Sequence, residues 1–570
     1  MFKKKENNKI ALKQICSKDP FEYIENWGNK FYVTKNPNAQ FSFAKTSIHN
    51  FNLAFIPYNF EELKMTFLFE DEKETLNLNY YIYLPNIITT NQLLGSNYNN
   101  YDQDDFDKFY ENEIKKHQNE IFHPNIFELE KKYKKLKGII FEEKEDEQKN
   151  TKKEIEWDFR YPQNDKGIKC RVDVKNEINI IVQETFSLDQ EKAEELLYKC
   201  IKQFHQNKYR VVIIQNNNGG GNIDLAIYLR QILQVKIQDR LYLSYPTTEK
   251  FKEMYDNILA FSRYDVETCK PFQTFEEFAQ GDDVNYSTEN QTIIHHRSRM
   301  VDLVTKDQRK ELYNIRKEFL KLNYKKPTDI IIFTDSYSYS STSFFIKAFQ
   351  NVGGAITVGF NGNPNSTKEL FDASQSPANV LQSFDDCEEK DNLEKLGFKL
   401  GGITMGESYE DDYKNNNSIP REYKLNPVDE RVDIYEPYTD ETYDIFIEKA
   451  KEIFKKYNEQ EECNPDNKRL IFEKEEDNKC YNFTDDEYAH GGYICGDDGK
   501  WNYTSCQKYY CDLGYYYNIY EGKCIIDKCT NDPDEKEIIL DDFYEKEIII
   551  NKENNIEYIF QINTKEYIFI

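Results

Sequence analysis

Short, mainly apolar runs recur in the middle of the chain, and a polar turn follows each of the first two. The runs occupy residues 210–214, 330–333 and 355–360, with Arg210 at the start of the first and Thr357 within the third. Mainly apolar runs of this length are typical of strands that are buried on both faces of a sheet. Apolar residues at helical spacing come next, over 223–229 and from 344 to 349. The succession of buried strand, turn and helix predicts an α/β core.

The pattern changes on either side of this core. Alternating residues predict a strand over 41–55. We expect an N-terminal α+β domain over 1–175 and an α/β core over 176–457 that carries a helical insertion at 236–326. A cysteine-rich, β-rich module would follow at 458–532, and alternation of Ile, Tyr and Phe with charges predicts a short β segment at 533–570.

Two serines stand where the second apolar run turns into its helix. Ser340 and Ser341 follow the polar turn and precede the apolar helix positions. Unpaired N–H groups at a helix N-terminus can stabilise an oxyanion at such a serine. Serine is also among the commonest residues that cap helices, so a purely structural cap is the competing interpretation.

A glycine-rich turn follows the first apolar run. Residues 215–222 read QNNNGGGN, and the successive glycines allow backbone N–H groups to approach a ligand closely. A phosphate-binding loop would need a following Lys-Ser or Lys-Thr pair, or a G-x-G-x-x-G motif, and the chain has neither at this place.

Together the two turns resemble the signature motifs of the tail-specific, or C-terminal-processing, serine proteases. The first family motif is D-x-R-x-N-x-G-G, which Asn218, Gly220 and Gly221 match. Ile214 and Asn216 stand where the family has Asp and Arg.

The second family motif, in eukaryotic-type members, is T-D-G-x-C-x-S. Residues 334–340 read TDSYSYS, so Ser336 and Ser338 replace the Gly and Cys. Val358 and Gly359 form the V-G pair that the family places after its serine. The resemblance covers 30–457 and is strongest over 175–235 and 328–382.

The resemblance implies a crotonase-like core of repeated ββα units and assigns roles to residues of both turns. Ser340 would be the nucleophile, and the backbone N–H groups of Gly220 and Ser341 would form the oxyanion hole. The substrate would be a polypeptide, and no cofactor or metal is implied.

The base that activates the serine follows from the same resemblance. Many family members use a lysine after the V-G strand, but Asn365 occupies that position here. A second branch uses Ser, His and Glu, and His49 and Glu422 match the places of its histidine and glutamate. Asp429 and Glu430 are alternatives to Glu422.

Cysteines crowd into the C-terminal part of the chain. This segment is rich in turn residues and cannot bury a large core, so disulfides are expected to hold it. Zinc is the alternative, but the spacings lack paired C-x-x-C motifs. The number is odd, so one cysteine pairs outside the segment, stays free or pairs between chains. They are Cys463, Cys480, Cys495, Cys506, Cys511, Cys524 and Cys529.

Net charge and composition exclude several partners. The net charge of -27 argues against nucleic acid and anionic membranes as partners. No apolar run is long enough to span a bilayer. The adjacent His295 and His296 suggest a metal pair, but no third ligand is near, so a surface loop is the expectation.

The expected cellular location is extracellular or in the secretory pathway. Disulfides and candidate N-glycosylation sequons favour it, although no signal peptide is evident at the start of the sequence.

Two functional hypotheses remain. One is a secreted serine endopeptidase that forms an acyl-enzyme on Ser340. The other is a catalytically inactive relative that binds peptides or a surface partner, with the cysteine-rich module as a docking site for an extracellular partner.

Overall fold

The computed structural model describes residues 2–5, 8–31, 36–47, 64–69, 76–79, 155–162, 166–236, 241–246, 248–249, 252, 263–286, 292, 294–366, 370–375, 380–383, 395, 402–405, 408–410, 424–466, 469–473, 488–518 and 521–530. Residues Met1–Thr530 form one compact unit and Asn531–Ile570 a second. The β segment predicted at 533–570 lies outside the described residues.

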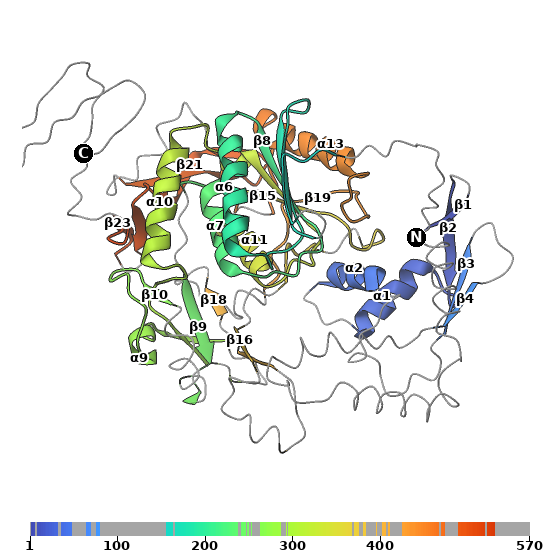
Figure 1. Cartoon of the computed structure of the whole chain (residues 1–570), viewed down its shortest axis with the longest axis horizontal. Helices are drawn as coiled ribbons and strands as arrows, with labels where there is room; N and C mark the ends of the chain where they lie inside the picture. Colours follow the sequence, from blue (N-terminus) through green and yellow to red (C-terminus); the bar gives the residue numbers. More distant parts are fainter. Residues whose placement is uncertain are drawn as a thin grey trace, which may run out of the picture. The chain divides into compact units, whose positions relative to one another are not determined.

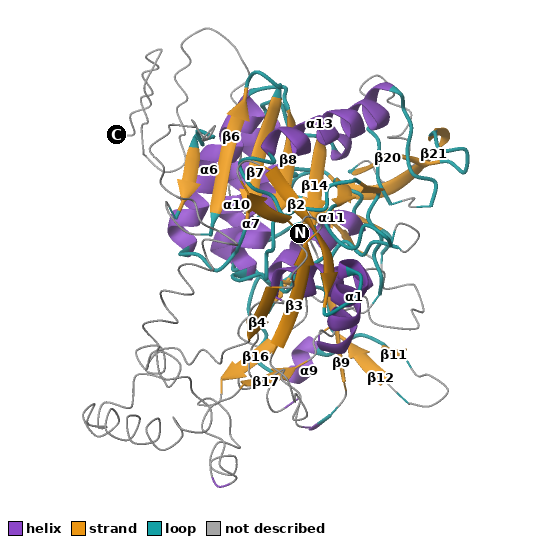
Figure 2. Ribbon diagram, turned by 90° about the vertical axis from the view of Figure 1, so that its right-hand side faces the viewer, coloured by secondary structure: helices purple, strands orange, loops and turns teal. Residues whose placement is uncertain are grey.

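A seven-stranded sheet with the order β19-β15-β14-β8-β7-β6-β5 lies at the centre of the first unit. The five strands from β19 to β7 run parallel to one another, whereas β6 is antiparallel to β7 and to β5. The strands are Phe159–Tyr161 (β5), Ile168–Asp173 (β6), Ile178–Gln183 (β7), Arg210–Gln215 (β8), Ile330–Thr334 (β14), Ile356–Gly359 (β15) and Glu430–Arg431 (β19). Figure 2 shows β6, β7, β8 and β14 within this sheet.

Both faces of the sheet are buried, because alternate residues of each strand enter two separate cores. Val211 and Ile213 of β8 belong to one apolar cluster, whereas Val212 and Ile214 belong to the other. This burial explains why the strands read as mainly apolar runs. The α/β class predicted from the sequence is confirmed.

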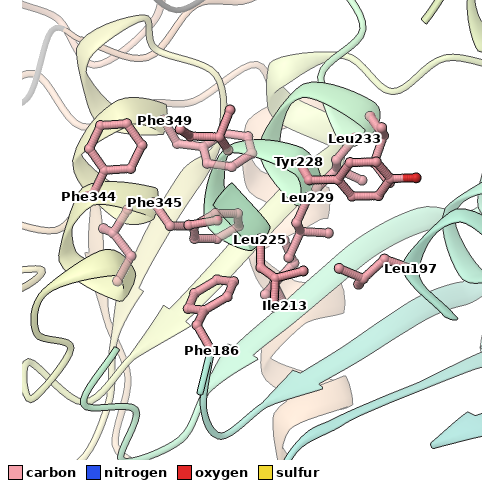
Figure 3. Close-up of a cluster of buried hydrophobic side chains, with 14 of the residues drawn as sticks. Phe186, Leu197, Ile213, Leu225, Tyr228, Leu229, Leu233, Phe344, Phe345 and Phe349 are labelled. Atoms are coloured by element: carbon pink, nitrogen blue, oxygen red, sulfur yellow. The ribbon is translucent and has the colours of Figure 1, made fainter. Parts of the chain in front are cut away.

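Helices cover the two faces unequally (Figure 1). The first cluster contains residues of α6, α7, α10 and α11, and the second contains residues of α13. The bounds are Gln190–Gln206 (α6), Ile223–Leu233 (α7), Lys306–Leu320 (α10), Ser341–Asn351 (α11) and Tyr443–Phe454 (α13). Figure 3 shows Phe344, Phe345 and Phe349 of α11 beside Leu225 and Leu229 of α7.

An N-terminal segment adds two helices and a small antiparallel sheet. The helices are Pro20–Phe31 (α1) and Pro37–Ser47 (α2), and the strands, in the order β1-β2-β3-β4, are Phe2–Lys5, Asn8–Ile15, Lys64–Phe69 and Leu76–Asn79. The strand predicted over 41–55 is wrong in its first part, because residues up to Ser47 belong to α2. One side of α2 contacts the loop that follows β15. This side carries Asn38, Ser42 and Lys45, which recur at helical spacing.

The described part of the segment 236–326 contains strands as well as helices. A four-stranded sheet has the order β11-β12-β9-β18, with strands Asp283–Asn285 (β11), Ile294–Arg297 (β12) and Tyr242–Pro246 (β9) from this segment and Ser408–Glu410 (β18) from later in the chain. Further elements of the segment are Tyr264–Asp265 (β10), Val301–Asp302 (β13) and Phe275–Phe278 (α9). Beyond the segment, Val380–Ser383 (β16) pairs with Gly402–Met405 (β17).

The cysteine-rich segment forms two hairpins and contributes to the core. Its strands are Ala489–Cys495 (β20), Trp501–Cys511 (β21), Tyr515–Asn518 (β22) and Lys523–Ile526 (β23). Trp501 lies in the same cluster as residues of the central sheet, and its indole N–H donates to the carbonyl of Tyr457 at 3.1 Å.

Disulfides hold this segment, as predicted. Cys463 pairs with Cys495 and Cys511 with Cys524, while Cys529 pairs with Cys269, outside the segment. A further disulfide, Cys170–Cys200, joins β6 to α6 and was not predicted.

Candidate active site

Ser340 lies immediately before helix α11, at the end of the turn that follows β14. Its backbone has φ 54°, in the left-handed region that non-glycine residues rarely adopt. Its hydroxyl makes no capping hydrogen bond, and the residue is partly exposed. A side chain that served only as a helix cap would bond to the first N–H groups of the helix. The capping interpretation therefore does not describe this serine.

Positive φ angles gather around this turn. Ser336 has φ 65°, Asn217 in the glycine turn has φ 52°, and Asn361 after β15 has φ 65°. Residues held in sparsely populated backbone regions persist only where the surrounding structure fixes them, and they cluster at functional sites. All three positions lie beyond the carboxyl ends of the parallel strands β8, β14 and β15. Open α/β sheets bind ligands at this edge.

The glycine turn lies directly against Ser340. A Cβ atom placed on Gly220, which has φ 102°, would stand 2.7 Å from the Cβ of Ser340 and 2.7 Å from the carbonyl oxygen of Tyr339. The N–H of Tyr339 also donates to the carbonyl of Asn218 at 3.2 Å. The two turns that resemble the family motifs, more than a hundred residues apart in sequence, therefore meet.

The two predicted oxyanion donors differ in their present partners. The N–H of Gly220 donates to the side-chain Oδ1 of Asn218 at 3.0 Å, so an acceptor within the turn already occupies it. The N–H of Ser341 has no acceptor among the described residues, and it would stand 3.1 Å from a Cβ on Gly220. Asn218 is itself held by Gln215, whose Oε1 accepts its amide at 3.0 Å.

Asp335 joins the two turns, and the sequence analysis did not single it out. Its Oδ2 accepts the N–H of Asn217 at 2.8 Å, and its Oδ1 accepts the N–H of Tyr337 at 3.0 Å. Burial raises the pKa of the Asp335 carboxyl from its ordinary value of 3.8 to about 6, against the opposing effect of these N–H groups and of Lys45. Its place in the T-D motif after a buried strand was the available signal.

Gln375 is a second contact that the sequence did not reveal. Its side-chain amide donates to the carbonyl of Ser336 at 2.6 Å, and its backbone N–H donates to the carbonyl of Ser338 at 2.7 Å. Both carbonyls belong to the Ser340 turn. The turn is thus also held by a residue 35 positions beyond Ser340 in the chain.

Helix α2 packs on the loops that surround the site. The hydroxyl of Ser42 accepts the N–H of Gly362 at 3.0 Å, and the ring of Phe43 lies 4.1 Å from that of Tyr337. The ammonium of Lys45 donates to the side chain of Asn361 and, at 2.7 Å, to the carbonyl of Tyr435. Burial lowers the pKa of Lys45 to about 8, although the negative charges of Asp335 and Glu436 oppose this shift.

The predicted base and its partner, His49 and Glu422, lie outside the described residues. The two alternatives to Glu422 lie among the described residues, and both are hydrogen-bonded to groups outside the Ser340 turn. Asp429 is buried and accepts the N–H and hydroxyl of Thr357 at 2.7 and 2.8 Å. Glu430 accepts the ammonium of Lys456 at 2.6 Å and the hydroxyl of Tyr457 at 2.8 Å.

The histidine pair is not the surface loop that was predicted. His295 and His296 lie on β12, where adjacent side chains point to opposite faces. His295 is buried beside the hydroxyl of Ser244, at 3.1 Å, and burial lowers its pKa to about 4. His296 pairs with Asp283 at 2.6 Å. Within the described ranges, no three His, Cys, Asp or Glu side chains are grouped so that they could hold a metal ion.

Comparison with known proteins gives fold-level likenesses only. No family model and no curated protein sequence matches the chain. Among solved structures, mature CPAF is 12% identical, with 79% of this chain and 78% of that chain covered and a TM-score of 0.36.

Two further structures are similar. The photosystem II D1 C-terminal processing protease is 10% identical, with 46% and 44% of the chains covered and a TM-score of 0.24. A lipoprotein from Streptococcus agalactiae is 12% identical, with 50% and 70% covered and a TM-score of 0.27. At TM-scores below 0.5, none of these likenesses assigns the chain to a family or an activity.

No helix in the described part of the chain combines the length and apolar character that crossing a membrane requires.

Proposed function

We propose that the chain is a serine-type peptidase that cleaves polypeptides through an acyl-enzyme on Ser340. One observation carries this proposal: Ser340, which is partly exposed and whose hydroxyl makes no capping bond, is held at φ 54° against the Gly220 turn. Strained strand-to-helix turns present nucleophilic serines in this way in other hydrolases. A serine with a purely structural role would not need this positive φ angle.

The oxyanion would form between the two turns. The N–H of Ser341 is free to donate to it, and the N–H of Gly220 would join when the developing negative charge displaces the Asn218 amide oxygen. A charged acceptor forms the stronger hydrogen bond, which favours the exchange. Loss of one such donor typically lowers the stabilisation of a transition state by about 3–4 kcal/mol.

His49 is proposed as the general base and Glu422 as the residue that orients it, both from the family resemblance. The contact of Phe43 with Tyr337 supports this choice, because it anchors the end of α2 beside the Ser340 turn, a few residues before His49. A histidine titrates near neutral pH and suits this role.

The reaction would then proceed in two halves. The Oγ of Ser340 attacks the scissile carbonyl while His49 takes its proton, and the C–N bond breaks as His49 returns the proton to the leaving amine. Water, deprotonated by His49, attacks the acyl-enzyme and releases the carboxylic acid and the free serine.

Secretion and a crotonase-like core complete the proposal. Disulfides persist in oxidising compartments, which favours an extracellular or secretory location. The parallel strands β7, β8, β14 and β15 with α6, α7 and α11 between them support the repeated-unit core implied by the family.

Cleavage of an unfolded polypeptide tests the proposal. The full chain should cleave reduced, alkylated casein, and Ser340→Ala should remove the activity. Thr342→Val is the matched control, because Thr342 lies two residues away with a buried hydroxyl that has no described partner. Equal cleavage by the wild type and Ser340→Ala would refute the proposal.

The second candidate is a catalytically inactive peptide-binding protein. It is favoured by the occupied N–H of Gly220, since an unused oxyanion donor can remain bonded within its own turn. In that case the wild type would bind casein peptides without cleaving them, and Ser340→Ala would bind them equally well.

A further inference from the structure

One carboxylate holds the two halves of the candidate site together. Asp335 is 3% exposed, and its two oxygens accept N–H groups from different turns, that of Asn217 beside the glycines and that of Tyr337 before Ser340. Hydrogen bonds to a charged acceptor are about twice as strong as neutral ones. The position of the glycine turn relative to Ser340 therefore depends on this side chain.

Asp335 also accounts for part of the local backbone strain. Asn217 donates to Asp335, and Ser336 lies between Asp335 and the second donor, Tyr337; both Asn217 and Ser336 have positive φ. A non-glycine residue in this region costs about 1–3 kcal/mol and needs support from its surroundings. The Asp335 carboxylate supplies that support on both sides.

Helix α2 places a positive charge near this carboxylate. The ammonium of Lys45 is bonded to Asn361 and to the Tyr435 carbonyl, and Asp335 and Glu436 are the acids that act on it. Among the described residues, Tyr337 is a further titratable group beside Asp335, and burial together with this carboxylate raises its pKa. A buried carboxylate is unstable as an anion unless a cation or donors compensate it.

We propose that Asp335 is a positioning residue of the serine chemistry: its carboxylate bonds to both turns and fixes the glycine turn against Ser340. This rests on the proposed function. Asp335 is not expected to contact the substrate.

The bridge should weaken in acid. Burial raises the pKa of the Asp335 carboxyl to about 6. Below about pH 6 the carboxyl is protonated and becomes a weaker acceptor for the two N–H groups.

The first test is the rate at which a fluorophosphonate labels Ser340, measured from pH 5 to 9. Asp335→Asn should slow labelling at pH 7 by roughly 100-fold, the typical effect of displacing a reacting group by about 1 Å. Asp335→Glu should restore part of the rate.

Asp265→Asn is the matched control. Asp265 is also buried and accepts two turn N–H groups, those of Glu267 at 2.7 Å and Thr268 at 2.8 Å, but in a turn of the inserted segment. The rate at which Ser340 is labelled in Asp265→Asn should equal the rate in the wild type. Equal slowing in Asp265→Asn and Asp335→Asn would mean a general structural effect and would overturn the inference.

The second test does not need activity. Hydrogen exchange of the Asn217 and Tyr337 amides should accelerate at least tenfold in Asp335→Asn, with no matching change in the amides of β7. If these amides exchange as in the wild type, the inference is overturned, whether or not Ser340 reacts. If they accelerate but the wild-type protein is not labelled, the proposed function fails and the bridging role of Asp335 stands.

Discussion

At the scale of single residues, the candidate site depends on backbone conformations that ordinary side chains avoid. Ser340 and Gly220 both have positive φ, and their contact leaves no room for an extra atom between them. The free hydroxyl of Ser340 follows from this backbone, because the residue stands at the start of α11 without capping it. The contact between the two turns is therefore the feature on which the proposed chemistry depends.

Gly220→Ala tests that contact. The added methyl would stand 2.7 Å from the Cβ of Ser340, at a φ of 102° that alanine disfavours, so casein cleavage should fall by about 100-fold. Gly219→Ala is the control, since its methyl would meet the Tyr337 hydroxyl at 3.4 Å, an ordinary contact. The measurement is the steady-state kcat/KM of the two variants. Full activity in Gly220→Ala would contradict the proposed geometry.

The motifs identified Ser340 and Gly220 from the sequence, but not the residues that hold them. Asp335 and Gln375 act through contacts with backbone groups of the turn, and such contacts depend on the relative placement of loops far apart in sequence. No local pattern of apolar and polar residues records that placement. The occupied N–H of Gly220 could not be foreseen for the same reason.

At the scale of elements, the apolar runs of strands that are buried on both faces of the sheet predicted the structure best. Strands β8, β14 and β15 and helices α7 and α11 follow the predicted positions. Helix α2 was predicted as a strand because Phe41 and Phe43 are two residues apart. Its polar face, with Asn38, Ser42 and Lys45, contacts the loops of the site, so the apolar pattern gave no helical signal.

Strand β12 provides a prediction about acid stability. Burial lowers the pKa of His295 from 6.5 to about 4, so between these values the unfolded chain binds more protons than the folded one. The free energy of unfolding should therefore fall as the pH drops from 7 to 4.5. His295→Phe keeps the ring packing against Tyr286, whose centroid is 5.0 Å away, and cannot take up a proton.

Urea midpoints at pH 7 and pH 4.5 measure this effect. Other titrating groups contribute equally to both proteins, so the midpoint should drop further in the wild type than in His295→Phe. Equal drops would show that His295 is not held neutral by the fold.

At the scale of the molecule, the cysteine-rich segment is packed into the main core. Trp501 stacks on Phe472 at 5.2 Å and shares a buried cluster with strands of the central sheet. The disulfide Cys269–Cys529 joins the segment to residues 260 positions earlier. These links argue that it stabilises the fold in addition to any docking role.

Trp501→Ala should destabilise the whole unit. Truncating a buried tryptophan typically costs about 3–5 kcal/mol, so a single unfolding transition should move to lower urea concentration. Tyr503→Ala, two residues away and 38% exposed, should have a smaller effect. Circular dichroism and tryptophan fluorescence monitor the transition. An unchanged main transition with a separate early one would mean that the segment folds independently of the sheet.

The central claim is that the Oγ of Ser340 is a reactive nucleophile, and mapping a covalent adduct tests it most directly. The intact protein is treated with a fluorophosphonate at pH 7, digested and analysed by tandem mass spectrometry. The proposed site predicts one adduct, on Ser340, and none in Ser340→Ala. An adduct on another serine, or labelling that persists in Ser340→Ala, would contradict the claim.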